Sequence, residues 1–206
     1  MARFLDGSGK AALTAAVQAV EGRSAAEVVI AVQPAAGIYL HADLLAGVIA
    51  GVATLAFLLF SHAPFGVAWI LVDPLVVGAL AGLLCSRSPG LRRALTPARL
   101  RRRFVEAAAR AAFFERGVHL TSGRTGVLVY VGLCERSAAV IGDRGVEAAL
   151  PADLWREAQA RVRGAVEAGE AAAAVAAAIA ALGDALAPYL PRAEDDVNEL
   201  PDEVHE

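Results

Sequence analysis

The residues best suited to chemistry surround Asp143, in the segment Gly142-Asp143-Arg144-Gly145. The preceding run, residues 137–141, is apolar and typical of a short strand, so Asp143 is expected at the carboxyl end of that strand. Ligands bind at such strand ends in open α/β sheets. A carboxylate between two glycines is presented together with backbone oxygens, and oxygens are the ligands that Ca²⁺ and Mg²⁺ prefer. We therefore identify Asp143 as a candidate metal ligand.

One carboxylate cannot hold a hard cation, because Ca²⁺ takes six to eight oxygen ligands. Glu27 can join Asp143 if the predicted strand at residues 26–32 lies beside residues 137–141. The alternative interpretation is an ordinary turn with a structural ion pair, since Gly, Asp and Arg are common there. Arg144 and Arg136 are candidate contacts to a phosphate group or a partner, because guanidinium groups pair well with such anions. Arg136 also fits a solvated pair with Glu135.

Motifs of better-known chemistry are missing from this sequence. It contains no P-loop, no G-x-G-x-x-G, no G-x-S-x-G and no zinc-ligand spacing, and its two cysteines, Cys85 and Cys134, match no redox or metal pattern. No catalytic residue is therefore assigned, and Ca²⁺ or Mg²⁺ is the one cofactor class left open.

These candidates require an α/β domain to position them. Residues 126–131 and 137–141 are β-rich runs joined by a short polar connection, which predicts a β-hairpin. Both runs are apolar on both faces, so helices are expected on both sides of the sheet. Apolar periodicity and capping signals predict four such helices. The predicted helices are residues 7–21, 97–116, 151–168 and 170–187.

A second part of the chain is too apolar for a soluble domain. Apolar residues make up 57% of the chain, and mean hydropathy is +0.51. Residues 44–60 carry no charge, and residues 66–85 are interrupted only by Asp73-Pro74. Two such runs joined by a short turn predict a transmembrane helical hairpin with both ends on one side.

Arginines flank the hairpin on its carboxyl side, at positions 87, 92, 93, 99, 101, 102 and 103. By the positive-inside rule this flank is cytoplasmic, which predicts a multi-pass protein of the plasma (inner) membrane with its N- and C-terminal parts in the cytoplasm. Beside a membrane span, these arginines are expected to face anionic lipid headgroups, so the lipid bilayer rather than nucleic acid is the expected partner.

Asp73 allows two interpretations. An acid inside a membrane span indicates an ion or proton role. However, Pro74 disfavours helical geometry at Asp73, so a wide turn that places Asp73 near the outer headgroups is the structural alternative.

The predicted organisation has four parts. Residues 1–40 supply the first helix and strand of the soluble domain, residues 41–86 form the hairpin, residues 87–190 complete the soluble domain, and residues 191–206 form an acidic tail.

The pattern resembles the TPM domain family. The matching segments are residues 24–32 (SAAEVVIAV), 116–121 (RGVHLT), 126–131, 135–136, 139–146 (AVIGDRGV), Trp155 and 198–203 (NELPDE). The resemblance implies an α/β/α sandwich with a small central sheet, here interrupted by the hairpin, and docking of residues 198–203 on the domain. Members of this family are commonly membrane-attached. Phosphatase activity, receptor accessory roles and calcium binding are each associated with some of them.

Three functional hypotheses follow. The first is a membrane-anchored, non-enzymatic module that binds a membrane or cytoplasmic protein or supports a membrane complex, with oligomers possible. The second is a divalent-metal-dependent phosphatase centred on Asp143. The third is an ion- or proton-handling role for Asp73.

Overall fold

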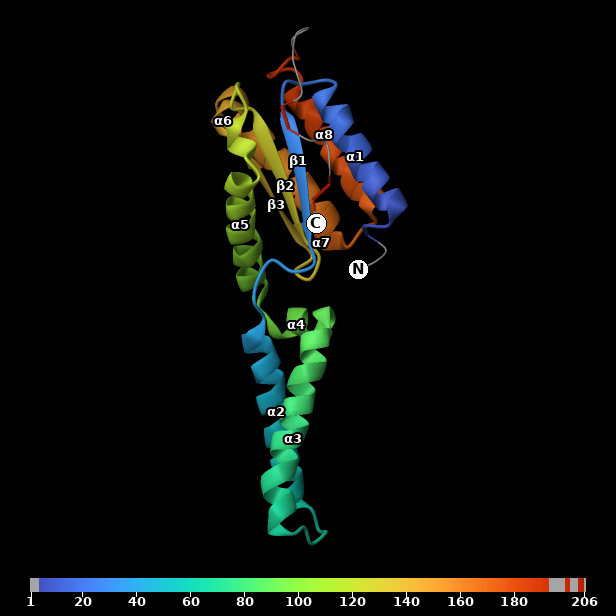
Figure 1. Ribbon diagram of the computed structural model, residues 1–206, viewed down its shortest axis with the longest axis vertical. Helices are drawn as coiled ribbons and strands as arrows, with labels where there is room; N and C mark the ends of the chain where they lie inside the picture. The colour runs from blue at the N-terminus through green and yellow to red at the C-terminus, as the bar shows by residue number, and fades with distance from the viewer. Residues whose placement is uncertain (1–3, 193–198, 201–203, 206) are drawn as a thin grey trace. The chain divides into compact units, whose positions relative to one another are not determined.

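The computed structural model describes residues 4–192, 199–200 and 204–205. The chain divides into two compact units, one made of Met1–Ala36 and Arg102–Glu206 and the other of Gly37–Arg101 (Figure 1). The first unit is thus built from two stretches of sequence that the second unit separates.

The first unit contains a three-stranded mixed sheet. Its strands are β1 (Glu27–Gln33), β2 (Gly126–Gly132) and β3 (Ser137–Gly142), in the order β1-β2-β3. β1 runs parallel to β2, and β2 runs antiparallel to β3. The predicted β-hairpin is therefore confirmed. β1 lies beside β2 and not beside β3, so the condition under which Glu27 and Asp143 were expected to converge is not met.

Helices cover both faces of this sheet (Figure 1). Val28, Ile30 and Val32 point to the face covered by α1 (Gly7–Glu21), α7 (Ala152–Ala168) and α8 (Ala172–Leu186). The alternate residues Val29 and Ala31 pack against α5 (Ala98–Glu115) on the other face. Because each strand is buried on both faces, its sequence is a continuous apolar run rather than an alternating one. The α/β class is confirmed, with layers in the order helix, sheet, helix.

Local signals explain some of the helix ends. Asp6 caps α1 by accepting a hydrogen bond from the backbone nitrogen of Gly9 at 2.7 Å. Gly169, in a left-handed conformation, ends α7. Two short helices, η1 (Val118–Leu120) and α6 (Arg144–Ala149), complete the first unit and had not been predicted.

Glu135 differs from its expected role as a solvated partner of Arg136. Its side chain is buried in the β2–β3 connection and accepts a hydrogen bond from the backbone nitrogen of Ala36 at 2.8 Å. This bond links the segment after β1 to the β2–β3 hairpin. Arg136, in contrast, is exposed.

The second unit is a helical hairpin. Helices α2 (Leu40–Phe60) and α3 (Val67–Arg87) run antiparallel, and α4 (Pro89–Leu95) follows. Their contact is made by four glycines, Gly47 and Gly51 on α2 and Gly78 and Gly82 on α3. A Cβ added at any of them would lie within 2.8–3.0 Å of a carbonyl oxygen on the other helix. Glycines spaced by four residues allow this backbone approach.

The remaining surface of the hairpin is apolar and exposed. Val48, Phe57 and Leu75 are 61%, 65% and 75% exposed, and both helices have a mean hydropathy of 2.2 over 18 residues. Each helix is 21 residues long, which is enough to cross the hydrocarbon layer of a bilayer.

Asp73 lies inside α3 rather than in a turn. α3 continues through both Asp73 and Pro74, and the connection between the helices falls at residues 61–66. The alternative of a wide turn at Asp73 is therefore not observed. The helix continues because a proline at this position removes only one intrahelical hydrogen bond, and the close contact with Gly51 supports the helix there. Within the described residues, no hydrogen bond or ion pair reaches the half-buried Asp73 carboxylate.

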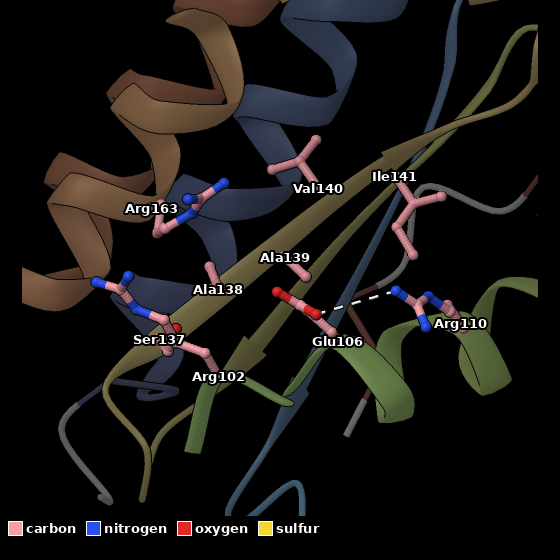
Figure 2. A pocket seen from close by; sticks show the side chains of 9 residues that line it. All are labelled: Arg102, Glu106, Arg110, Ser137, Ala138, Ala139, Val140, Ile141 and Arg163. Carbon is pink, nitrogen blue, oxygen red and sulfur yellow. Dashed lines mark ion pairs between the residues drawn. The ribbon is translucent and has the colours of Figure 1, made fainter. Parts of the chain in front are cut away.

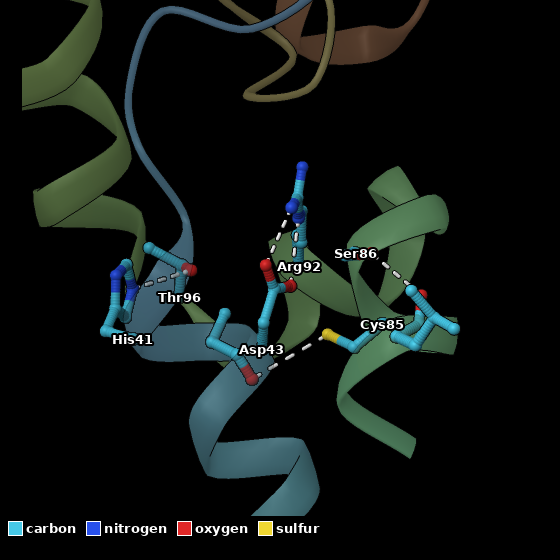
Figure 3. Close-up of polar contacts among 8 residues, drawn as sticks. His41, Asp43, Cys85, Ser86, Arg92 and Thr96 are labelled. Atoms are coloured by element: carbon cyan, nitrogen blue, oxygen red, sulfur yellow. Dashed lines mark hydrogen bonds and ion pairs between the residues drawn. The ribbon is translucent and has the colours of Figure 1, made fainter. Parts of the chain in front are cut away.

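Polar side chains hold the open end of the hairpin together (Figure 3). Arg92 of α4 donates two hydrogen bonds to Asp43 of α2, at 3.0 and 2.7 Å. The buried thiol of Cys85 donates to the carbonyl of Ala42, and Thr96 contacts His41 at 3.1 Å. One of the flanking arginines, Arg92, therefore stabilises the hairpin itself.

Candidate functional site

The candidate site lies at the end of the sheet where β1 and β2 begin and β3 ends. Glu27 pairs with Gly126 in the parallel ladder, and the Asp143 backbone nitrogen donates to the Gly126 carbonyl at 2.8 Å. Glu27, Gly126 and Asp143 therefore form a row across the three strands. Alternation along each strand directs all three toward the face covered by α5 and η1.

Asp143 has a structural role that its sequence context did not reveal. It is the N-cap of α6, where its Oδ1 accepts a hydrogen bond from the Arg144 backbone nitrogen at 2.8 Å. Oδ2 lies 3.4 Å from Nε of Arg124 and is buried, and it accepts no hydrogen bond from the described residues. The side chain is only 7% exposed, so the Arg124 guanidinium is its nearest countercharge. Part of its hydrogen-bonding capacity is left unused.

The loop before β2 supplies Arg124, which sequence reasoning did not identify. Arg124 has a positive φ of 54°, and its carbonyl accepts a hydrogen bond from Gly145 at 2.9 Å. A Cβ at Gly145 would lie 2.6 Å from that oxygen, so only glycine fits here. Thr121 Oγ1 accepts from the backbone nitrogens of Thr125 and Gly126 and fixes the other end of the loop. The one available sequence signal was Ser122-Gly123, a turn-type dipeptide just before Arg124.

The described part of the tail docks beside Glu27. The Leu200 backbone nitrogen donates to Glu27 Oε2 at 3.3 Å, and Glu199 accepts from the Ser122 backbone nitrogen at 2.9 Å. Hydrogen bonds from the Ser122 hydroxyl and backbone hold the pKa of Glu199 below its ordinary value. These contacts agree with the expected docking of residues 198–203. Residues 198 and 201–203 themselves lie outside the described residues.

In this arrangement the carboxylates do not form a complete cation site. β2 lies between Glu27 and Asp143, and two strand spacings place their α-carbons about 10 Å apart. A Cβ at Gly126 would lie 2.1 Å from the Val118 carbonyl, so that backbone fills the space between them. Among the described residues, no group of three or more His, Cys, Asp and Glu side chains surrounds a common point. Carboxylate oxygens are suitable ligands for Ca²⁺ or Mg²⁺, but the observed geometry does not bring together as many oxygens as such a cation requires.

The remaining candidate residues lie apart from each other. Arg144 is exposed next to Asp143, whereas Arg136 lies in the β2–β3 connection at the opposite end of the strands, close to Gly169. One phosphate group therefore cannot contact both arginines. Asp73 belongs to the other unit.

Comparison with known proteins identifies the domain but no activity. Residues 93–185 match the sequence model of the TPM domain family. The NMR structure of BA42 from the psychrophilic bacterium Bizionia argentinensis superposes with a TM-score of 0.59 at 16% sequence identity, covering 98% of this chain and 94% of BA42. At that identity the likeness shows the fold alone. No curated protein matches the chain. Residues 93–185 are thus identified as a TPM domain by sequence, and the shared fold agrees with that match.

Proposed function

We propose that this protein is a plasma-membrane-anchored, non-enzymatic TPM-domain module that binds a partner protein. The observation that carries the proposal is the pair of 21-residue apolar helices, packed on each other through glycines with their other faces exposed. In water this surface would be far larger than the apolar patches that monomeric soluble proteins tolerate. In a bilayer, lipid chains would cover it.

The expected orientation follows from the antiparallel packing and from charge. Both ends of an antiparallel hairpin lie on one side of a membrane. Arg87, Arg93 and Arg99 flank that end, and their side chains have no hydrogen bond or ion pair in the described part of the chain. Arginines next to a span favour the cytoplasmic side, where they would contact anionic lipid headgroups. The TPM domain, connected at the same end, would then also be cytoplasmic.

A binding role is supported by what the sheet-end residues already do. Asp143 caps α6 and pairs with Arg124, and Glu27 holds the tail through Leu200. These contacts make the row a structural element that stiffens the domain. A rigid domain on a membrane anchor is suited to presenting a binding surface.

Alkaline carbonate extraction tests the anchor. We expect the full-length protein to remain in the membrane pellet, and Val52→Asp with Leu80→Asp to release it, because a charge at the centre of each span costs about 3 kcal/mol.

A single Ser61→Cys thiol, in a background without Cys85 and Cys134, should react with a membrane-impermeant maleimide from outside. Lys10→Cys should react only after permeabilisation. Extraction of the wild-type protein by carbonate would remove the anchor from the proposal, and outside labelling of Lys10→Cys would reverse the orientation.

Partner binding is tested separately. After solubilisation in a mild detergent, light scattering should give a particle heavier than one chain plus its micelle. A monomeric particle under all solubilisation conditions would contradict the binding role and leave the anchor intact.

A divalent-cation site at Asp143 is a second candidate, favoured by the buried Oδ2 atom, which accepts no hydrogen bond within the part of the chain that the structure describes. Titration calorimetry with Ca²⁺ and with Mg²⁺ tests it. A site centred on Asp143 requires saturable binding to the wild type and its loss in Asp143→Asn, a variant that keeps the N-cap because asparagine caps helices as well as aspartate does. Asp153→Asn, an exposed acid at the start of α7, is the matched control. Absence of saturable binding to the wild type would leave Asp143 as a cap and would remove the basis for a metal-dependent phosphatase.

A further inference from the structure

An open pocket lies beside β3, between α5 and α7 (Figure 2). Its volume is about 180 Å³, and Ser137–Ile141 of β3 form its floor. Four charged residues form its walls, namely Arg102, Glu106 and Arg110 from α5 and Arg163 from α7. The pocket belongs to the TPM domain and lies away from the row of Glu27, Gly126 and Asp143.

The floor of the pocket is the edge of the sheet. In the part of the chain that the structure describes, β3 pairs only with β2. Opposite residues in an antiparallel ladder alternate between hydrogen-bonded and non-bonded pairs. The bond from Asp143 to Gly126 fixes this alternation, so that Ala138 and Val140 direct their backbone groups away from β2.

One backbone group on this edge already accepts a hydrogen bond from a side chain. Gln159 of α7 donates to the Val140 carbonyl at 2.9 Å. Within the described residues, the Ala138 N–H and C=O and the Val140 N–H have no hydrogen bond. Unpaired groups of this kind form a template for an additional strand.

The charges around the edge are mainly positive. Arg102 reaches across the Ser137 end of β3 to pair with Glu167 of α7 at 3.0 Å. Arg110 contacts Glu106 at 3.9 Å, and both side chains are more than half exposed. Arg163 forms no ion pair in the described part of the chain. Three guanidinium groups face two carboxylates, and the excess lies beside Ala138–Ile141.

We infer that the β3 edge binds an extended acidic segment of a partner protein, which adds to the sheet as a fourth strand. This inference rests on the partner-binding role proposed above and names its surface and its class of partner. Backbone hydrogen bonds to Ala138 and Val140 would supply sequence-independent affinity, as in other cases of strand addition. Successive side chains of the segment would point alternately toward α5 and toward α7. A carboxylate on the α5 side would meet Arg110, and one on the α7 side would meet Arg163. The pocket volume accommodates one carboxylate side chain.

The probe is a seven-residue peptide, blocked at both ends, in which adjacent central residues are glutamate, so that one carboxylate lies on each face of the added strand, and the other residues are threonine. We expect saturable binding to the full-length protein in detergent micelles, measured by fluorescence anisotropy, and slowed hydrogen exchange at the Ala138 and Val140 amides. Affinity should fall as salt rises, because exposed charges are screened. A peptide with glutamine in place of glutamate, and one N-methylated on the edge that faces β3, should each bind about tenfold more weakly or not at all.

Variants of the protein complete the test. Arg110→Gln with Arg163→Gln should weaken peptide binding by about tenfold or more, because both cations facing the segment are lost. Arg156→Gln, an exposed position on α7 outside the pocket, is the matched control and should leave binding unchanged. All these positions are exposed, so the variants are expected to fold.

Three outcomes would overturn the inference. They are absence of saturable binding, binding that the Arg110 and Arg163 changes leave intact, and competition by inorganic phosphate without protection of the Ala138 and Val140 amides. The last would identify a small-anion pocket instead. None of them affects carbonate extraction or the mass of the solubilised particle, so failure here is distinguishable from failure of the anchored-module proposal.

Discussion

Replacing Gly47 by leucine is expected to open the α2–α3 hairpin. The Cβ alone would lie 2.9 Å from the Gly78 carbonyl oxygen, and the rest of the side chain would have to displace the α3 backbone. Inserting extra atoms into a packed interface costs about 1–3 kcal/mol, and more where the neighbour is backbone. We expect a loss of about 3 kcal/mol or more, since neither helix can move without giving up its remaining glycine contacts.

Alkylation of Cys85 measures this opening. Its thiol is fully buried against the Ala42 carbonyl at the open end of the hairpin, so it reacts only when the helices separate. In a Cys134→Ala background, Gly47→Leu should accelerate alkylation about 100-fold, since about 1.4 kcal/mol corresponds to a factor of ten. Val48→Leu adds the same side chain at a neighbouring position that is 61% exposed, and should leave the rate unchanged. Equal rates in all three proteins would contradict the glycine-mediated packing.

Replacing Gly126 by alanine is expected to destabilise the TPM domain severely. The added Cβ would lie 2.1 Å from the Val118 carbonyl oxygen and 2.8 Å from a Val118 methyl group. Gly126 lies in the central strand, paired with β1 on one side and bonded to Asp143 on the other, so the backbone cannot shift to make room. A cost of more than about 3 kcal/mol is expected, a large share of the 5–15 kcal/mol that stabilises a typical domain.

Urea denaturation followed by Trp155 fluorescence measures this cost. Trp155 is buried in the core of the TPM domain, and a Trp69→Phe background removes the signal of the hairpin. Gly164→Ala is the matched control, because its Cβ would meet nothing within 4 Å on an exposed turn of α7. That variant should be about 0.5–1 kcal/mol more stable than the parent, as alanine favours a helix over glycine. If Gly126→Ala unfolds at the same urea concentration as the parent, the close approach of Val118 is wrong.

Elements with a strong periodic pattern could be predicted from the sequence. The helix predicted at residues 7–21 is α1, and the β-hairpin lies where its two apolar runs placed it. The TPM family resemblance is confirmed by the match over residues 93–185. The two apolar helices and their connection were also predicted. Apart from the family resemblance, each of these features depends on residues close together in the sequence.

Features that depend on distant residues could not be predicted in the same way. Nothing local to residues 26–32 reveals that β1 pairs with β2 rather than β3. The cap formed by Asp143 was hidden because α6 has only six residues, too few to show a helical period. The effect of Pro74 on helical geometry was overestimated, because the local preference of the residue before a proline does not include the support that a neighbouring helix provides. The four glycines of the hairpin did carry a signal, their spacing of four along each helix, and it was missed.

The interrupted layout of the first unit has a consequence for biosynthesis. β1 leaves the ribosome about 100 residues before its partner β2, so at roughly 5–20 residues per second it waits on the order of 5–20 s for a neighbour. During that interval the intervening apolar hairpin is synthesised. The first unit can therefore close only after the hairpin has been made, and a nascent chain arrested before Gly126 would hold the hairpin attached to an unpaired, aggregation-prone strand.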